Sequence, residues 1–165
     1  MEHAFSEHNH THCQSSAVAQ AESICQSKGV RFTKLREQVF QLIWQSHKPI
    51  TAYKLLDLIK DSDFSATPPT VYRTLDFLLE QGLIHRINSL NAYVGCCQLG
   101  DSHTGTFMIC QQCGQAQEVD DRGISEAING ISKNFEFHVK GYATEIYGLC
   151  PSCYTSSPSA TGETE

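Results

Sequence analysis

Apolar residues over positions 15–60 recur at the three- and four-residue spacing of helices that bury one face. Ser15 or Ser16, Thr33 and Thr51 precede the three segments and are predicted to cap them, and Gly29 is predicted to end the first helix. The positions predicted to face the core are Val18, Ala21, Cys25, Leu35, Val39, Leu42, Ile43, Leu55, Leu58 and Ile59. This part of the chain is therefore predicted to form three packed helices.

The segment ATPPTVYRTLDFLLEQG predicts a fourth helix with well-marked ends. Thr67 is a suitable N-cap, the two prolines after it stand where a missing N–H costs little, and Gly82 suits the left-handed conformation after the last turn. The residues predicted to be buried are Val71, Leu75, Leu78 and Leu79, and those predicted to be exposed near the start are Thr70, Arg73 and Thr74. The start of a recognition helix is the end that meets DNA bases.

A β-hairpin is predicted directly after this helix. LIHRI and AYVGC have the alternation of strands and flank NSLN, a sequence typical of turns. Helices followed by a hairpin in this order predict a winged-helix fold and a DNA-binding domain. The pattern leaves one alternative open, a module that binds other proteins through the same amphipathic helices.

The second half of the chain predicts a small α/β unit. TFMIC and QAQEV have the pattern of strands, RGISEAINGISKNF that of a helix, and FEFHVKGYATEIYGL that of a long strand or a strand pair. The whole chain is therefore predicted to be an α+β protein. Its predicted parts are a disordered histidine-containing tail (1–14), a winged-helix domain (15–97), a connection (98–105), a small α/β domain (106–153) and a disordered tail (154–165).

Two Cys-x-x-Cys pairs bracket this second unit, Cys110 with Cys113 and Cys150 with Cys153. Pairs with this spacing are typical of structural zinc, which binds four thiolates in a tetrahedron. The 36 residues between the pairs exceed the loop of a simple zinc ribbon, so a folded unit is expected to bring them together. Incidental buried cysteines are the competing explanation, and they do not account for two pairs.

Charge is distributed unevenly along the chain, whose net charge is −6. Residues 1–95 hold nine Lys or Arg and nine Asp or Glu, whereas residues 96–165 hold three and nine. Because DNA binding depends on local positive charge, the first half remains a candidate for it and the second does not. The polar start and the lack of a long apolar run predict a cytoplasmic protein without a membrane span. Because thiols stay reduced in the cytoplasm, metal binding explains the eight cysteines better than disulfides do.

Residues from about 20 to 153 resemble the ferric uptake regulator family of bacterial metal-responsive repressors, through RFTKLREQV, PPTVYRTLDFLLEQGLIHRI and the two cysteine pairs. The resemblance implies an N-terminal winged-helix domain, a C-terminal dimerisation domain and a regulatory metal site near the hinge. Within the family, DFLLEQGLIHRINSLNAYVGC and SHTGTFMICQQCGQAQEV are most similar to the zinc uptake regulators. The HHDH run usual in iron and peroxide sensors is replaced here by SHTG.

The resemblance implies that His85, Cys96, His103 and Glu118 form the regulatory zinc site. Two neutral imidazoles, a thiolate and a carboxylate match a divalent charge, and a donor set with a thiolate suits Zn²⁺ better than Fe²⁺ or Mn²⁺. Cys97 is an alternative to Cys96, since alternation along a strand points the two in opposite directions. With the four-cysteine site, two zinc ions per chain are predicted, one structural and one regulatory.

These expectations combine into a homodimeric, zinc-responsive repressor of zinc-uptake genes, whose partner is double-stranded operator DNA. A regulatory ion shared by both domains would fix their relative orientation, and in a two-fold dimer this sets the separation of the recognition helices. Tyr53 and Arg73 are expected to contact bases. Arg36, Thr70 and Tyr72 are expected to contact the phosphate backbone or to pack nearby.

Three other functions compete with this one. An iron or manganese sensor of the same family is one alternative, and a zinc storage or delivery protein is another. Storage is favoured by the leading HNHTHC, in which His8, His10, His12 and Cys13 could bind metal weakly. An enzyme is not expected, because no open-coordination motif such as HExxH occurs, and no small-molecule substrate beyond zinc is expected.

Overall fold

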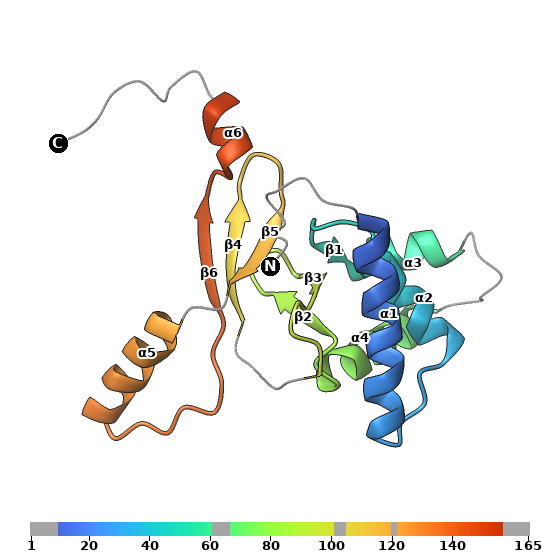
Figure 1. The fold of residues 1–165 in the computed structure, drawn as a ribbon, viewed down its shortest axis with the longest axis horizontal. Helices are drawn as coiled ribbons and strands as arrows, with labels where there is room; N and C mark the ends of the chain where they lie inside the picture. The colour runs from blue at the N-terminus through green and yellow to red at the C-terminus, as the bar shows by residue number, and fades with distance from the viewer. Residues whose placement is uncertain (1–9, 61–66, 101–104, 120–121, 157–165) are drawn as a thin grey trace.

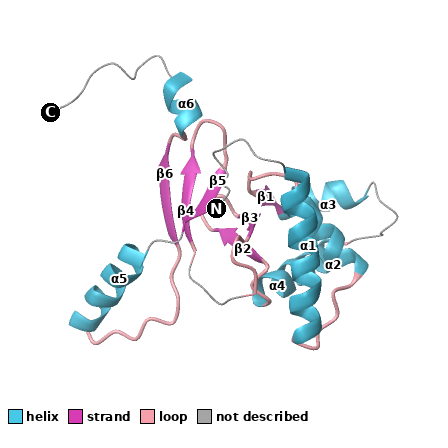
Figure 2. Ribbon diagram, in the orientation of Figure 1, coloured by secondary structure: helices cyan, strands magenta, loops and turns pink. Residues whose placement is uncertain are grey.

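The computed structural model describes residues 10–60, 67–100, 105–119 and 122–156, which form two units with one three-stranded sheet each (Figure 1, Figure 2). The first unit, the winged-helix module, contains α1 (His10–Ser27), α2 (Lys34–Ile43), β1 (Ile50–Thr51), α3 (Ala52–Lys60), α4 (Pro68–Glu80), β2 (Ile84–Ile87) and β3 (Ala92–Gly95). The second module contains β4 (Thr106–Cys110), β5 (Ala116–Val119), α5 (Arg122–Asn134), β6 (Thr144–Gly148) and α6 (Pro151–Ser156). None of the described helices has both the length and the apolar character needed to cross a membrane.

Capping residues set the starts of α2 and α3 as predicted. Thr33 accepts the Arg36 N–H at 3.5 Å, and Thr51 accepts the Lys54 N–H at 3.3 Å. Gly82 follows α4 with a φ of +69°, a conformation that glycine adopts without strain. The helices enclose a core that includes Val39, Phe40, Ile43, Leu55, Leu56, Ile59, Val71, Leu75, Phe77 and Leu78. The predicted core residues that are only half-buried are Val18, Leu35, Leu42, Leu58 and Leu79.

Helix α1 begins at His10, so the predicted cap at Ser15 or Ser16 is wrong, and residues 10–14 are helical rather than a disordered tail. No glycine or proline interrupts this stretch. The Gln14 side chain donates a hydrogen bond from Nε2 to the Gln41 carbonyl of α2 at 2.9 Å, which holds these turns against the bundle. The proposed weak metal ligands of the tail lie outside the described part of the structure, namely His8 and the side chains of His10, His12 and Cys13.

The predicted hairpin is confirmed as β2 and β3, which pair antiparallel from Ile84↔Gly95 to Ile87↔Ala92. The Asn91 N–H closes the turn on the Asn88 carbonyl at 3.2 Å. Strand β1 adds to the free edge of β3, which gives the order β1-β3-β2. This two-residue strand is too short to leave an alternating pattern in the sequence.

The second sheet has the order β5-β4-β6, in which β5 pairs antiparallel and β6 parallel with β4. The parallel pair needs a crossover, which α5 and the segment after it provide. The predicted long strand over 135–149 is wrong, because β4 offers only five residues for pairing and β6 is limited to Thr144–Gly148. Helix α6 extends to Ser156, so the C-terminal tail begins later than the predicted residue 154.

A separate apolar cluster joins the two modules. Ile87 and Val94 of the hairpin pack with Phe107, Ile109 and Ala116 of the second sheet. The hairpin therefore lies between the helices and the second sheet (Figure 1).

Candidate metal centres

The two cysteine pairs meet at one end of the second sheet. Cys110 is the last residue of β4, Cys113 lies in the turn to β5, and Cys150 and Cys153 follow β6. Their sulfur atoms all lie within 4.8 Å of one another. The parallel register places Cys110 beside Gly148, two residues before the second pair, so the sheet and its crossover are the folded unit that the spacing required.

The sulfur geometry fits tetrahedral zinc. Four sulfurs about 2.3 Å from one ion are separated by about 3.8 Å, and the Sγ atoms of Cys113 and Cys150 are 3.8 Å apart. Burial raises the pKa of the Cys110 thiol, but backbone N–H groups of Cys113, Cys150 and Gln112 outweigh burial and lower this pKa to about 6. The hydrogen bond with Cys150 raises the pKa of Cys153 to about 12. A divalent cation would balance the negative charge that further deprotonation adds here.

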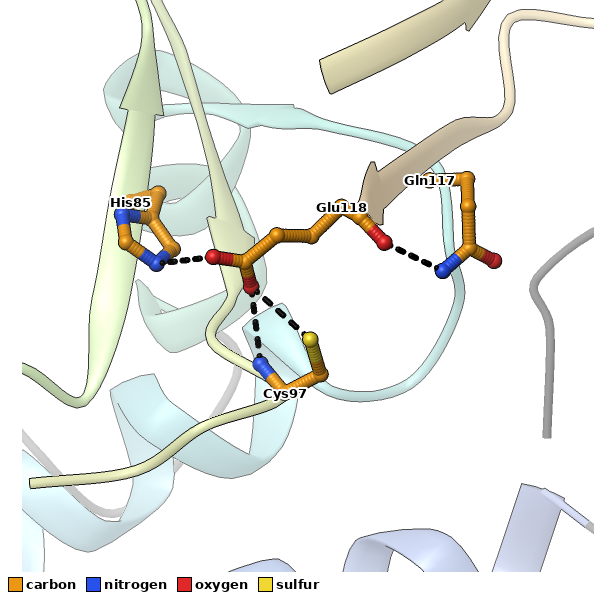
Figure 3. Close-up of polar contacts among 4 residues, drawn as sticks. All are labelled: His85, Cys97, Gln117 and Glu118. Carbon is orange, nitrogen blue, oxygen red and sulfur yellow. Dashed lines mark hydrogen bonds and ion pairs between the residues drawn. The ribbon is translucent and has the colours of Figure 1, made fainter. Parts of the chain in front are cut away.

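A second group of potential ligands joins the two modules. His85 is in β2, Cys96 directly follows β3, and Glu118 is in β5, yet their ligand atoms lie within 4.8 Å of one another. His85 Nε2 is 2.9 Å from Glu118 Oε1, and these side chains are 16% and 7% exposed. Figure 3 shows Glu118 extending from β5 toward the hairpin. Three of the four predicted regulatory ligands therefore converge, and His103 lies outside the described residues.

The carboxyl group of Glu118 is ionised at neutral pH. Burial raises its pKa, but the hydrogen bond and charge of His85 and the hydrogen bonds of Cys97 have the greater effect and lower the pKa to about 2. Metal ligands must be deprotonated, so Glu118 is already in the form that binds an ion. Nitrogen, sulfur and oxygen atoms within 4.8 Å of one another can bind one Zn²⁺ ion.

Cys96 and Cys97 lie directly after β3, which ends at Gly95, and only one of them belongs to the ligand group, as predicted. Cys96 is buried and belongs to the ligand group. Cys97 is exposed, and both its backbone N–H and its thiol donate to Glu118 Oε2, at 3.0 and 3.1 Å (Figure 3). Cys96 therefore fits the ligand position, and Cys97 orients the carboxylate.

Two contacts near the site could not be inferred from the sequence. The ring of Phe107 lies edge-on to that of His85, with centroids 5.2 Å apart. Trp44 packs so closely on Gly95 that a Cβ there would lie 2.5 Å from the indole. Both contacts join segments far apart in the sequence, so only the fold brings Phe107 and Trp44 against the segments that carry the ligands.

The residues predicted to contact DNA bases are accessible. Tyr53 on α3 is 73% exposed, and Arg73 on α4 is also exposed. Tyr72 is 43% exposed. The Arg36 guanidinium lies 3.4 Å from the centroid of the Phe77 ring, so Arg36 packs nearby, which is one of the two roles predicted for it.

Two threonines of α4 have partners near the start of the helix. The Thr70 and Thr67 hydroxyls lie 2.9 Å apart. Thr74, predicted to be exposed, is 5% exposed, and its hydroxyl donates to the Thr70 carbonyl at 2.9 Å. This bond satisfies the polar atom and allows the side chain to be buried. Thr74 therefore cannot reach a base edge from this position.

Comparison with known proteins identifies relatives that match this chain across both modules. Residues 27–147 match the Ferric uptake regulator family. The chain is 41% identical over 138 residues to the zinc uptake regulation protein of Escherichia coli (strain K12), across 82% of this chain and 80% of that protein. It is similar to a solved zinc uptake regulator complexed with zinc and DNA, with a TM-score of 0.81, 39% identity and coverage of 87% of this chain and 96% of that one.

A relative solved in two forms bears on how the modules are arranged. The chain is 36% identical to XcZur and has a TM-score of 0.79 with its holo form, covering 85% of this chain and 98% of that one. With the apo form, at the same identity and coverage of 85% and 97%, the TM-score is 0.50. The relative and the identity are the same in both comparisons, so the difference in TM-score reflects a difference in conformation between its two forms. The arrangement of the two modules in this chain therefore resembles that of the holo form. By its sequence, its fold and the arrangement of its modules, the chain belongs to the ferric uptake regulator family.

Proposed function

We propose that this chain is a zinc-responsive transcriptional repressor of the bacterial cytoplasm. It binds operator DNA as a homodimer when loaded with zinc, and it releases the DNA when zinc is scarce, so that zinc-uptake genes are expressed. The observation that carries the proposal is the convergence of His85, Cys96 and Glu118 from two modules on one point. His103 is the proposed fourth ligand.

The proposed mechanism depends on how the hairpin is attached to the recognition helix. Leu83, directly before β2, is fully buried, and its N–H bonds to the Leu78 carbonyl of α4 at 2.9 Å. Fixing the hairpin against the second module therefore fixes α4 as well. An ion bound by ligands from both modules would supply this link. Because ligand binding shifts an equilibrium only by its differential affinity, coupling of about 1–3 kcal/mol, or roughly 5- to 150-fold in DNA affinity, is expected.

Two zinc ions per chain are proposed, with different roles. Cys110, Cys113, Cys150 and Cys153 form a closed set of four thiol ligands inside one module, which suits a structural ion. The regulatory set has mixed donors and lies between modules, where opening of the interface would release its ion. Its thiolate favours zinc over iron or manganese. The proposed boundary between the DNA-binding and dimerisation domains is the connection 98–105.

The second module offers a surface for the proposed dimer. Helix α5 buries no residue and stands beside the sheet rather than on it (Figure 1). The exposed large apolar residues of this module are Met108, Ile131, Phe135, Phe137, Ile146, Tyr147, Leu149 and Tyr154. Many exposed large apolar side chains within one small module are typical of a protein–protein interface. A second copy of the chain would cover it symmetrically.

A Phe137→Asp variant is expected to weaken the dimer, because the Phe137 side chain is 68% exposed in one chain and would be buried by the partner. The expected rise in the dissociation constant is about 30-fold or more, which corresponds to about 2 kcal/mol. Analytical ultracentrifugation over a range of concentrations measures this constant. Leu90→Asp in the hairpin turn, 44% exposed, is the matched control and should leave the dimer intact. Equal dissociation constants for the two variants would contradict this dimer surface.

An Arg73→Ala variant is expected to lose preference for the operator while keeping its zinc. Arginine can bind guanine through two hydrogen bonds in the major groove, so its loss should cost about 1–3 kcal/mol in specific binding. Competition between operator and unrelated duplex measures this loss. Arg122→Ala, an exposed arginine of α5, is the control with the same charge change. Undiminished preference in the Arg73 variant would remove this residue from base recognition.

The proposed function is tested on the full chain with DNA selected from a random duplex pool in the presence of zinc. The recovered duplex is then titrated with protein that has been treated with a mild chelator and reloaded. The proposal expects one zinc ion per chain to resist chelation and one to be removed, with loss and recovery of DNA affinity. Equal affinity before and after removal would overturn the regulatory function.

A further inference from the structure

The face of the second sheet that contacts the hairpin carries a row of three residues. Phe107 in the central strand pairs with Glu118 on one side and with Glu145 on the other. Paired residues on neighbouring strands project from the same face of a sheet. Glu118 and Phe107 both reach His85, through its Nε2 and its ring. Glu145 is the third member of the row, and its hydrogen bonds run to Asn88, Ser89 and Tyr147 rather than to the described metal ligands.

Glu145 binds the turn of the hairpin. Its Oε1 accepts the Asn88 N–H at 2.7 Å, and the Ser89 N–H lies 3.4 Å from each of its carboxylate oxygens. The Tyr147 hydroxyl donates to Oε2 at 2.6 Å. Burial raises the pKa of Glu145, but hydrogen bonds from Ser89, Tyr147 and the Asn88 amide lower it overall, so the group is a carboxylate at neutral pH. A charged acceptor therefore holds consecutive amides of the other module.

The spacing of the row matches that of the hairpin. Strands in a sheet are about 4.8 Å apart, so the two glutamates stand about 10 Å apart across the row. Residues along a strand advance about 3.3 Å each, so the positions of His85 and Asn88 are also about 10 Å apart. Ile87, which lies between His85 and Asn88 in the chain, belongs to the same apolar cluster as Phe107. The hairpin is thus held at both ends, and only one end is a metal site.

We propose that Glu145 is a positioning residue for zinc-controlled DNA binding, a metal-free second anchor that holds the hairpin turn and completes the closed arrangement of the modules. This inference rests on the proposed function. The bond from the Ala116 N–H to the His47 carbonyl at 2.9 Å also joins the modules, and Glu145 adds an attachment at the hairpin turn, about 10 Å from the zinc site, that opposes rotation of the hairpin about that site. Because these hydrogen bonds form only when the modules close, they contribute to closure, and by linkage they raise the apparent affinity of the regulatory site for zinc.

The test uses full-length Glu145→Ala and Glu145→Gln, the second of which keeps the shape and removes the charge. DNA binding is measured at fixed protein while free zinc is set with a chelator buffer. The expected result is a shift of the half-maximal zinc concentration by about 5- to 10-fold upward for Glu145→Ala, with a smaller shift for Glu145→Gln and the same binding plateau at saturating zinc. A general loss of structure would lower the binding plateau instead, and it would not produce a larger shift of the midpoint in Glu145→Ala than in Glu145→Gln. Glu126→Ala, an exposed glutamate of α5, should leave the midpoint unchanged.

The outcomes separate this inference from the proposed function. If DNA binding by the unaltered chain depends on zinc and the midpoint of Glu145→Ala does not move, the anchor is wrong while the zinc-responsive function stands. A lowered plateau in Glu145→Gln without a change of midpoint also overturns the anchor. If DNA binding by the unaltered chain ignores zinc, the proposed function itself fails.

Discussion

A Cys150→Ser variant is expected to lose one tightly held zinc ion per chain and to unfold the second module at a much lower temperature. Cys150 is 5% exposed, its N–H donates to Cys110 Sγ at 3.3 Å, and it lies where β6 meets α6. Folding of small zinc domains draws about 10–16 kcal/mol from metal binding, so loss of one ligand removes a large part of that free energy. The β4–β6 pairing ends at this site, and the sheet should lose its fixed register there.

Metal analysis and thermal unfolding of the purified variant check this expectation. Cys25→Ala is the matched control, because Cys25 is also a buried cysteine but lies in α1, within the core of the winged-helix module. This control should keep both zinc ions and lose only the modest stability of a trimmed core side chain, on the order of 1 kcal/mol. A Cys150→Ser chain that retains its chelation-resistant zinc ion would remove Cys150 from the structural site.

Local signals predicted most of the winged-helix module. Thr33 and Thr51 cap helices because their hydroxyls accept N–H groups three residues on, and this chemistry depends only on neighbours in the chain. The hairpin around NSLN is local in the same sense. The predictions were wrong where contacts with distant segments of the chain determine where a helix or strand begins or ends. Helix α1 starts five residues before the first of the predicted caps, and β6 stops where its partner β4 stops.

The candidate site was predictable as a set of residue types but not as a geometry. Cysteine spacing predicted the four-cysteine group, and the resemblance to a family supplied the group of His85, Cys96 and Glu118. The roles of Cys97 and Glu145 depend on contacts between segments 21 and 57 residues apart, which no local pattern records. A charged residue in a predicted strand was the one available signal for Glu145, and by itself such a residue predicts only an exposed position.

A Glu118→Ala variant is expected to keep the structural zinc ion, lose the removable one and lose zinc-dependent DNA binding. The substitution removes the only ligand of the described regulatory group that comes from the second module. It also removes the acceptor of hydrogen bonds from Cys97 and the partner of His85, so these contacts between the modules are lost, while the bond from the Ala116 N–H to the His47 carbonyl remains. DNA affinity at saturating zinc should fall by about 10- to 100-fold, toward that of the chelated protein.

This prediction is tested by measuring zinc content and DNA affinity in the same preparation of each variant. Glu126→Ala changes charge equally within the second module but lies on exposed α5, so it should bind two zinc ions and respond to zinc like the unaltered chain. Cys97→Ala removes the thiol that donates to Glu118 but leaves the backbone N–H, so a partial loss of zinc affinity is expected from it. A Glu118→Ala protein whose DNA affinity still rises with zinc would show that the winged-helix module binds the ion without the second module, and the interdomain link would then not be the basis of regulation.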